Sequence, residues 1–276
     1  MPKTSPTPSN QFSFSRIKTF HQCPLRYRYR YLKGLRESFR SIESFLGSTV
    51  HLVLEWLYAE RNGSDSPNLD AALEQFARRW EEGWAEDVAV IKDSTTADDA
   101  LRLGKEMVAR FHRETFVQDR SETISLEQRF SVRLQSKVVF TGIADRVGRT
   151  ENGRLFVVDY KTSSRRGTAS EFSEGLQAPL YASCALRTVD DEEALAGYHY
   201  LRLGSTSWHR VTRSRADELL TRFQALVDEA RAAAEFPARP GILCAWCGFN
   251  AVCPEAEVQP HLGGGQRLAS AGLLPG

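Results

Sequence analysis

The fold is decided by the stretch Val157-Val158-Asp159-Tyr160-Lys161-Thr162-Ser163, in which an apolar run leads directly into a carboxylate and then an amine. Side chains two positions apart on a β-strand lie on the same face, so we expect Asp159 and Lys161 to point together. A preceding run, Gly142-Ile143-Ala144-Asp145-Arg146-Val147, carries a second carboxylate. If these two strands are neighbours, both carboxylates and the amine converge at one edge of a sheet.

Strand and helix patterns flank this stretch on both sides. Strand-like runs bounded by turn residues are expected at 124–134, 138–147, 154–161, 197–203 and 207–212. Apolar residues at helical spacing predict helices at 13–21, 24–32, 41–61, 69–87, 97–117, 175–186 and 214–235. This order indicates an α/β core with an N-terminal helical cap.

The chain shows no internal repeat and no convincing linker, which favours a single domain. We expect residues 12–258 to form it, with a helical cap over 12–120, a catalytic core over 121–235 and a cysteine-bearing tail over 236–258. The two ends, 1–11 and 259–276, are expected to be flexible. With 276 residues and 41% hydrophobic content, the chain can bury a sizeable core.

Net charge and hydropathy limit the kinds of partner that the protein is expected to bind. The net charge of +1 gives no global attraction to nucleic acid, so contacts with phosphates must come from local basic patches. Two patches are present, Arg26-Tyr27-Arg28-Tyr29-Arg30-Tyr31 and the pair Arg165-Arg166. No stretch is long and apolar enough to cross a membrane, and Met1 to Gln11 lacks the pattern of a signal peptide. We therefore expect a cytoplasmic protein with no membrane partner.

The acidic strand ends suit metal-dependent hydrolysis of phosphodiester bonds. Carboxylate oxygens bind Mg²⁺ or Mn²⁺, and a lysine beside the attacking water can orient it and stabilise developing charge. Taken alone, Asp159 and Lys161 are a weak signal, because an exposed salt-bridged strand end has the same pattern. His51, within an apolar helix, would by itself more often be a packing residue. The case rests on their combination.

That combination resembles the RecB-like branch of the PD-(D/E)XK nuclease superfamily. The resemblance rests on four motifs in the family's order, which together span residues 47–181: Gly47-x3-His51, Gly142-Ile143-Ala144-Asp145-Arg146, Val158-Asp159-Tyr160-Lys161-Thr162 and Gln177-x3-Tyr181. It implies a restriction-endonuclease-like core sheet flanked by helices. The second acid is Asp159, where glutamate is common, and this shortens its reach to a metal by one methylene.

The resemblance also implies residue roles. The metal ligands would be His51, Asp145, Asp159 and the main-chain carbonyl of Tyr160, with Lys161 as the catalytic lysine. Gln177 and Tyr181 lie one helical turn apart and would contact DNA and position the site; a surface glutamine and a packing tyrosine are the alternatives. Arg165 and Arg166 are added as DNA contacts. Glu127 matches a commonly acidic position and is left unassigned.

Four cysteines lie at the two ends of the chain: Cys23, Cys244, Cys247 and Cys253. A reducing compartment favours metal ligands over disulfides, and four thiolates suit either Zn²⁺ or a [4Fe-4S] cluster. Similarity to the iron-sulfur subgroup, which includes AddB-type and CRISPR-adaptation nucleases, favours the cluster. The C-terminal tail would then close an iron-sulfur site against the first helices. Cys184 is expected to be a buried small hydrophobe.

The leading hypothesis is a metal-dependent deoxyribonuclease, preferring single strands or ends, that acts in DNA repair, recombination or CRISPR adaptation. The sequence contains no G-x4-G-K-[ST] phosphate loop, so a helicase or integrase partner would be separate. One alternative is a non-catalytic DNA-end binding subunit of a helicase-nuclease or integration complex. Another is a zinc-stabilised nucleic-acid interaction module with incidental acidic strand ends.

Overall fold

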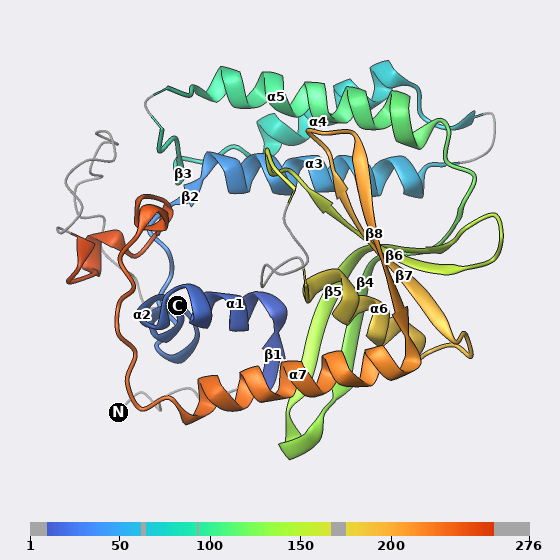
Figure 1. Ribbon diagram of the computed structural model, residues 1–276. Helices are drawn as coiled ribbons and strands as arrows, with labels where there is room; N and C mark the ends of the chain where they lie inside the picture. The colour runs from blue at the N-terminus through green and yellow to red at the C-terminus, as the bar shows by residue number, and fades with distance from the viewer. Residues whose placement is uncertain (1–9, 62–64, 93, 167–174, 257–276) are drawn as a thin grey trace, which may run out of the picture.

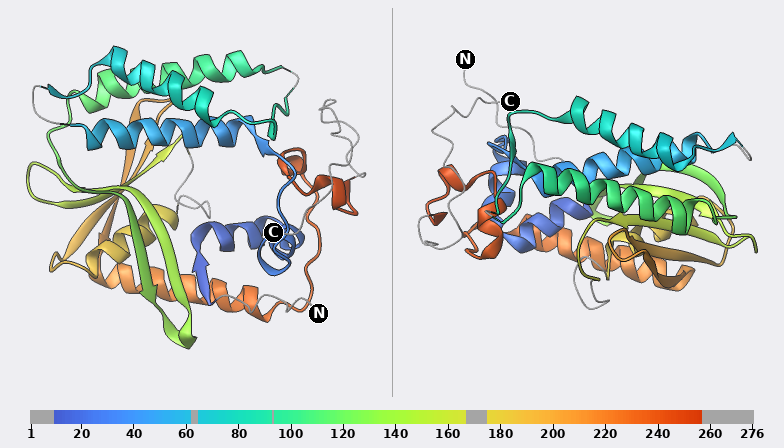
Figure 2. Two further views of the ribbon diagram at one scale, coloured as in Figure 1. Left: turned by 180° about the vertical axis from the view of Figure 1, so that it is seen from behind. Right: turned by 90° about the horizontal axis from the view of Figure 1, so that it is seen from above.

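A mixed sheet lies between two groups of helices in the computed structural model, which describes residues 10–61, 65–92, 94–166 and 175–256 (Figure 1). Helices α3 (Ile42–Ala59), α4 (Leu69–Gly83) and α5 (Ala97–Phe111) cover one face. Helices α1 (Phe14–Gln22), α6 (Gln177–Leu186) and α7 (Arg213–Ala232) lie on the other. The view from behind in Figure 2 shows the same two layers. An α/β core sheet flanked by helices was expected, and this is confirmed.

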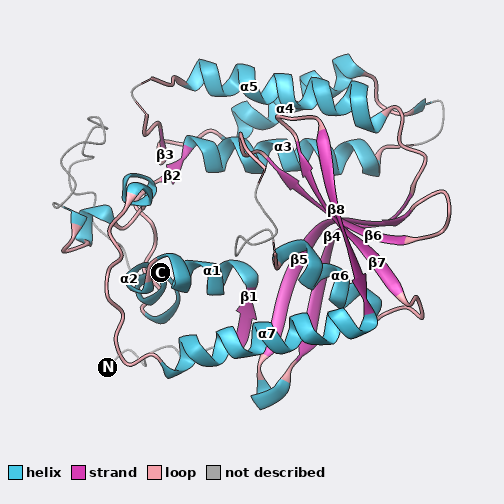
Figure 3. Ribbon diagram, in the orientation of Figure 1, coloured by secondary structure: helices cyan, strands magenta, loops and turns pink. Residues whose placement is uncertain are grey.

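The sheet follows the order β1-β5-β6-β7-β8, and β4 pairs with β5. Its strands are β1 (Gln11–Ser13), β4 (Glu122–Arg133), β5 (Val139–Arg149), β6 (Leu155–Lys161), β7 (Glu193–Tyr200) and β8 (Ser205–Thr212). Strands β6 and β7 are parallel, and α6 lies between them in the chain, because a parallel pair needs a crossover connection. Figure 3 shows these strands running between the helical layers.

Strand β5 forks at its middle. Strand β4 pairs along almost the whole of one edge of β5. The other edge is shared: β6 pairs with Arg146 to Arg149, whereas β1 pairs with Val139 to Thr141. The part of β5 between these two partners, 142–145, has no ladder partner on that edge. Asp145 therefore lies where β5 and β6 separate.

Two hydrophobic cores hold the layers together. Alternation along β6 sends Val157 into the core beneath α6 and α7, while Phe156, Val158 and Tyr160 join the core beneath α3 to α5. Asp159 follows Val157 in this alternation and turns toward α6. The long helices begin at capped residues: the side chains of Ser41, Asn68 and Thr96 each accept a hydrogen bond from a backbone amide three residues later.

The elements agree with the sequence patterns more closely at their centres than at their ends. Strand β1 overlaps the expected flexible leader, because three residues are too few to show an alternation. Helix α4 ends at Gly83 instead of residue 87, and β7 begins at Glu193 instead of 197. The helix expected over 24–32 changes after Tyr27 into a π-helical turn, Arg28–Leu32. No described helix is long and apolar enough to span a membrane.

After α7 the chain reaches back toward the N-terminal helices (Figure 1). Up to residue 256, where the described part ends, it contains two short 3₁₀ turns, Ile242–Trp246 and Asn250–Val252. The backbone amide and hydroxyl of Ser38 both donate to the Gly248 carbonyl, at 2.9 and 2.8 Å. The Tyr29 hydroxyl donates to the Val252 carbonyl at 3.3 Å. The two ends of the described chain therefore lie side by side.

Candidate active site

Asp145 takes the place of a strand partner at the fork. Its Oδ2 accepts a hydrogen bond from the Tyr160 amide at 2.6 Å. The last ladder pair between the two strands is Arg146 with Val158, so the Tyr160 amide has passed the point where β5 can pair with it. A carboxylate that satisfies this amide is held in a defined orientation.

Helix α3 brings His51 to the same place. Its Nε2 lies 3.0 Å from the Tyr160 carbonyl, and its Nδ1 lies 3.3 Å from Asp145 Oδ1. Gly47 lies one turn earlier on the same helix, and a Cβ there would stand in ordinary contact with Thr162, 3.4 Å from its Oγ1. Burial acts to lower the pKa of His51, but the charge and hydrogen bond of Asp145, helped by the charges of Asp159 and Glu127, raise it to about 9.

Asp159, Lys161 and Gln177 form a closed polar triangle on the α6 side. Lys161 Nζ lies 2.6 Å from Asp159 Oδ2 and donates to Gln177 Oε1 at 2.9 Å. Gln177 Nε2 donates to Asp159 Oδ1 at 2.8 Å. Asp159 is only 4% exposed. Burial raises the pKa of its carboxyl group, the Lys161 charge opposes this, and the net direction is upward.

Tyr181 lies next to this triangle as a packing residue. It is 6% exposed, and Gln177 Nε2 lies 3.5 Å from its hydroxyl group. A Cβ on Gly142 would lie 2.5 Å from its ring, so the glycine of the Gly-Ile-Ala-Asp motif makes room for Tyr181. The arrangement matches the packing alternative for this tyrosine, while Gln177 faces the polar residues.

Glu127, which sequence reasoning left unassigned, belongs to the candidate metal site. One ligand atom from each of Glu127, His51 and Asp145 lies within 4.8 Å of the other two. The neighbouring register pairs, Leu126 with Arg146 and Gln128 with Ala144, place Glu127 opposite Asp145. Its φ of +46° is unusual for a residue with a Cβ and marks local strain. No sequence pattern signals this conformation.

The donors suit a hard divalent cation. Carboxylates of Asp145 and Glu127, the Tyr160 carbonyl and the His51 imidazole offer mostly oxygen atoms, which Mg²⁺ and Mn²⁺ accept. Asp159 stands apart from this group in its ion pair with Lys161. Two of the predicted side-chain ligands, His51 and Asp145, thus meet at the predicted Tyr160 carbonyl. The third predicted side-chain ligand, Asp159, lies beside them as the neighbour of Tyr160 in β6.

A buried arginine supports the opposite side of this strand. Arg146 is 3% exposed and binds Asp119 at 2.6 Å, Ser121 at 2.8 Å and Thr123 at 2.8 Å. Its guanidinium carbon lies 3.7 Å from the ring centre of Tyr58, whose hydroxyl group donates to Asp119 at 2.7 Å. The residue after Asp145 is therefore anchored between α3 and the sheet.

Comparison with known proteins decides the family. The family model described as the PD-(D/E)XK nuclease superfamily matches residues 11–254. The chain belongs to this superfamily. The match supports the expected fold and a nuclease domain.

Curated relatives are components of helicase-nucleases. A Streptococcus agalactiae protein described as an ATP-dependent helicase/deoxyribonuclease subunit is 27% identical over 223 residues, covering 77% of this chain and 20% of that protein. The corresponding protein of Streptococcus uberis is 26% identical over 199 residues, covering 69% of this chain and 18% of that protein. This PD-(D/E)XK chain thus spans about a fifth of their length. The crystal structure of SSO0001 aligns with a TM-score of 0.40 at 13% identity, covering 91% of this chain and 89% of that one.

The two basic patches of this PD-(D/E)XK chain differ in structure. Arg165 and Arg166 are exposed in the loop after β6, beyond the catalytic lysine candidate. In the first patch Tyr27 is 2% exposed and packs in the core, and Arg26 pairs with Glu37 at 2.6 Å. Arg30 is exposed. The second patch is thus the more available to a phosphate backbone.

The four end cysteines of the PD-(D/E)XK chain are partly exposed and carry no disulfide, whereas Cys184 is buried as expected. Burial is the main cause that raises the pKa of the Cys247 thiol, and the charges of Glu37 and Cys23 add to it. Among the described residues, however, no three cysteine sulfur atoms lie within 4.8 Å of one another. A single zinc ion, with Zn–S bonds of about 2.3 Å, needs a tighter set. An iron-sulfur cube is larger and separates its ligands further.

Proposed function

We propose that the chain is a metal-dependent DNA nuclease whose active site is the fork between β5 and β6. One observation carries the proposal: His51 lies against both Asp145 and the Tyr160 carbonyl, at 3.3 and 3.0 Å, although these residues are far apart in sequence. A packing histidine needs no such pair of acceptors. Together with Asp159 they would hold Mg²⁺ or Mn²⁺, with Glu127 as a further carboxylate near the ion.

When bound, the ion supplies polarisation of the phosphoryl group and a more acidic water. The chain's own residues do the rest. Lys161 presents a cation beside Asp159, where it can orient the attacking water and balance charge on the phosphorane-like transition state. Gln177 bonds both members of this pair, and so it acts as a positioning residue for Lys161. Arg165 and Arg166 would contact the phosphate backbone of the substrate.

The finer function extends the same proposal. The chain would prefer single strands or ends, as an exonuclease in DNA repair, recombination or CRISPR adaptation. A motor would be a separate helicase partner, in keeping with the relatives named as helicase/deoxyribonuclease subunits. An integrase partner is the other candidate. A cytoplasmic setting follows from such a role.

We also propose a structural [4Fe-4S] cluster on Cys23, Cys244, Cys247 and Cys253. Its support is the position of the tail against the N-terminal segment and the hydrogen bond that the Gly241 amide donates to Cys244 Sγ at 3.4 Å. Zn²⁺ at the same cysteines is the alternative. The cluster would tie together the first helices and the tail.

The decisive test is cleavage of end-labelled single-stranded and duplex DNA by anaerobically purified protein with Mn²⁺, Mg²⁺ or EDTA. Wild type should cut only with metal, and Lys161→Ala should not cut. The matched control is Lys105→Ala, which removes an exposed lysine from α5 on the other side of the fold. A folded wild type that cuts neither substrate would support the non-catalytic end-binding role instead.

A further inference from the structure

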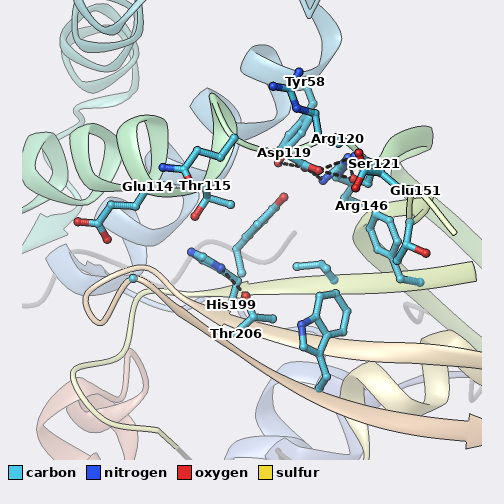
Figure 4. Close-up of a pocket in the computed structure, with 17 residues that line it drawn as sticks. Tyr58, Glu114, Thr115, Asp119, Arg120, Ser121, Arg146, Glu151, His199 and Thr206 are labelled. Carbon is cyan, nitrogen blue, oxygen red and sulfur yellow. Dashed lines mark hydrogen bonds and ion pairs between the residues drawn. The ribbon is translucent and has the colours of Figure 1, made fainter. Parts of the chain in front are cut away.

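A second concave site lies on the sheet face beneath α3, across β6 from the proposed metal site. The cavity has a volume of about 510 Å³, within the range of small-molecule sites. Figure 4 shows Tyr58, Arg146, His199 and Thr206 around it, with Glu114 and Thr115 from the turn after α5 on one side. Phe156, Val158 and Tyr160 of β6 form part of its floor. None of the proposed metal-binding or catalytic side chains lines it.

Trp208 provides a flat aromatic surface at this cavity. It lines the cavity and is 47% exposed, which is unusual for so large an apolar side chain. The ring lies directly over Gly197: a Cβ at that position would stand 2.6 Å from Trp208 Cζ3. Phe156 contacts it edge-on, with ring centres 6.0 Å apart. The strand below thus holds the indole flat and leaves its outer face open to a planar ligand.

His199 adds a buried polar group to the wall. It is 4% exposed, and its Nδ1 shares a hydrogen bond of 2.8 Å with the Thr206 hydroxyl. Its Nε2 is buried and has no hydrogen-bond partner among the described residues. This nitrogen has almost no accessible surface, so a ligand in the cavity cannot reach it while the wall keeps this arrangement. Burial lowers the pKa of His199 to about 4, which keeps the imidazole neutral near pH 7.

The charges at the cavity argue against a phosphate as its main ligand. Arg146 is already paired with Asp119 at 2.6 Å. The remaining charged lining residues are Arg120, Glu114 and Glu151, so acidic groups outnumber basic ones. A neutral ring that stacks on one face and hydrogen-bonds at its edge suits these walls better than an anion does. Base-aromatic stacking is the interaction that single-strand binders use, because every base has a π-face.

We propose that this cavity is a nucleobase-binding site, in which the base stacks on Trp208. Whether the base belongs to a substrate strand or to a free nucleotide depends on the proposed function. The binding of a base in the cavity does not depend on it. Tyr160 connects the two sites, since its ring lines the cavity while its carbonyl contacts His51. A base held here is remote from the bond being cut and would anchor the strand or sense a product.

Binding can be measured without divalent metal, so that cleavage plays no part and a failed nuclease assay leaves the result intact. The probes are deoxyadenosine monophosphate, a short deoxyadenosine oligonucleotide and a backbone of equal length that lacks bases. Trp208→Leu keeps an apolar side chain on Gly197 but removes the stacking ring. Trp84→Leu is the matched control, because Trp84 is similarly exposed, at 41%, and packs against Phe45 at the far end of α3.

Trp208→Leu should weaken binding of the base-containing probe about tenfold, and Trp84→Leu should not. Binding of the free nucleotide identifies a nucleotide site, and an effect confined to the oligonucleotide identifies a strand anchor. Either supports the proposal. Equal affinity for the abasic backbone, unchanged binding by Trp208→Leu, or no binding of any probe would overturn it. Gly197→Ala, which displaces the indole, is the second variant if Trp208→Leu does not fold.

Discussion

The fork of the sheet and the cysteine tail are built in opposite ways. At the fork, side chains from α3, β5, β6 and α6 meet through hydrogen bonds of 2.6 to 3.0 Å, and Asp159 is 4% exposed. In the tail, Cys244 lies in a short turn, Cys247 and Cys253 each follow the end of one, and all three are partly exposed. The tail contacts the N-terminal segment through bonds such as that from Ser38 to Gly248. The fork is preorganised by packing before any ion binds. The proposed cluster, by contrast, would itself draw the tail cysteines together.

The largest effect should come from the fork. Asp145→Asn keeps the shape of the side chain but removes the charge opposite His51. We expect metal-dependent cleavage to fall by about a thousandfold or more, because one carboxylate ligand and its negative charge are lost. The protein should stay folded and keep its visible absorption, although its melting temperature should fall because His51 loses the partner charge. The control is Asp70→Asn, in the first turn of α4. Full activity in Asp145→Asn would remove the fork as the active site.

The next largest effect should come from the cysteine tail, and it should appear in stability and colour. Cys247→Ser should lose brown colour and lower the melting temperature, because the cluster is proposed to tie the tail to the first helices. Cys184→Ala is the control: this thiol is buried in the α6 core, and its loss should leave the colour intact. Visible absorption and thermal melting read out both variants. A colourless Cys247→Ser that melts like wild type would mean that the tail needs no cluster.

The pH dependence of stability reports on the buried His199 of the sheet. Burial lowers the pKa of His199 to about 4 in the folded protein, against 6.5 for an unperturbed histidine. The unfolded chain therefore binds more protons between these values, so this contribution is full above pH 6.5 and is lost as pH falls toward 4. Its size is about 3 kcal/mol. Denaturant unfolding of wild type and His199→Phe at about pH 7.5 and about pH 4.5 should show a smaller pH effect in the variant; an equal effect would contradict this.

The smallest effect expected concerns positioning within the fork. Gln177→Ala removes the amide that bonds both Lys161 and Asp159. We expect kcat to fall about tenfold with KM nearly unchanged, since the lysine loses its orientation but keeps its charge. Gln177→Glu should also have a lower kcat than wild type, because a carboxylate cannot donate a hydrogen bond to Asp159. A change in KM alone would instead indicate that Gln177 contacts DNA.

The sequence predicted the centre of the fold better than its margins. Side-chain alternation and the order of the motifs can be read directly from the sequence, and they pointed to Asp145, Asp159, Lys161 and His51. Glu127 matched a commonly acidic position but received no role, since its place in the site depends on a positive φ and on its position opposite Asp145. The three residues of β1 carry too little pattern to be recognised.

By itself, the sequence determined the apolar periodicities, the acidic strand ends and the cysteine spacing, because these are properties of neighbours along the chain. The tertiary structure alone decided that β5 forks, that His51 reaches the Tyr160 carbonyl across 109 residues, and that Trp208 lies flat on Gly197 beside a cavity. Such features arise from packing between distant segments, where close contact at one glycine selects the geometry. Local propensity does not determine that choice.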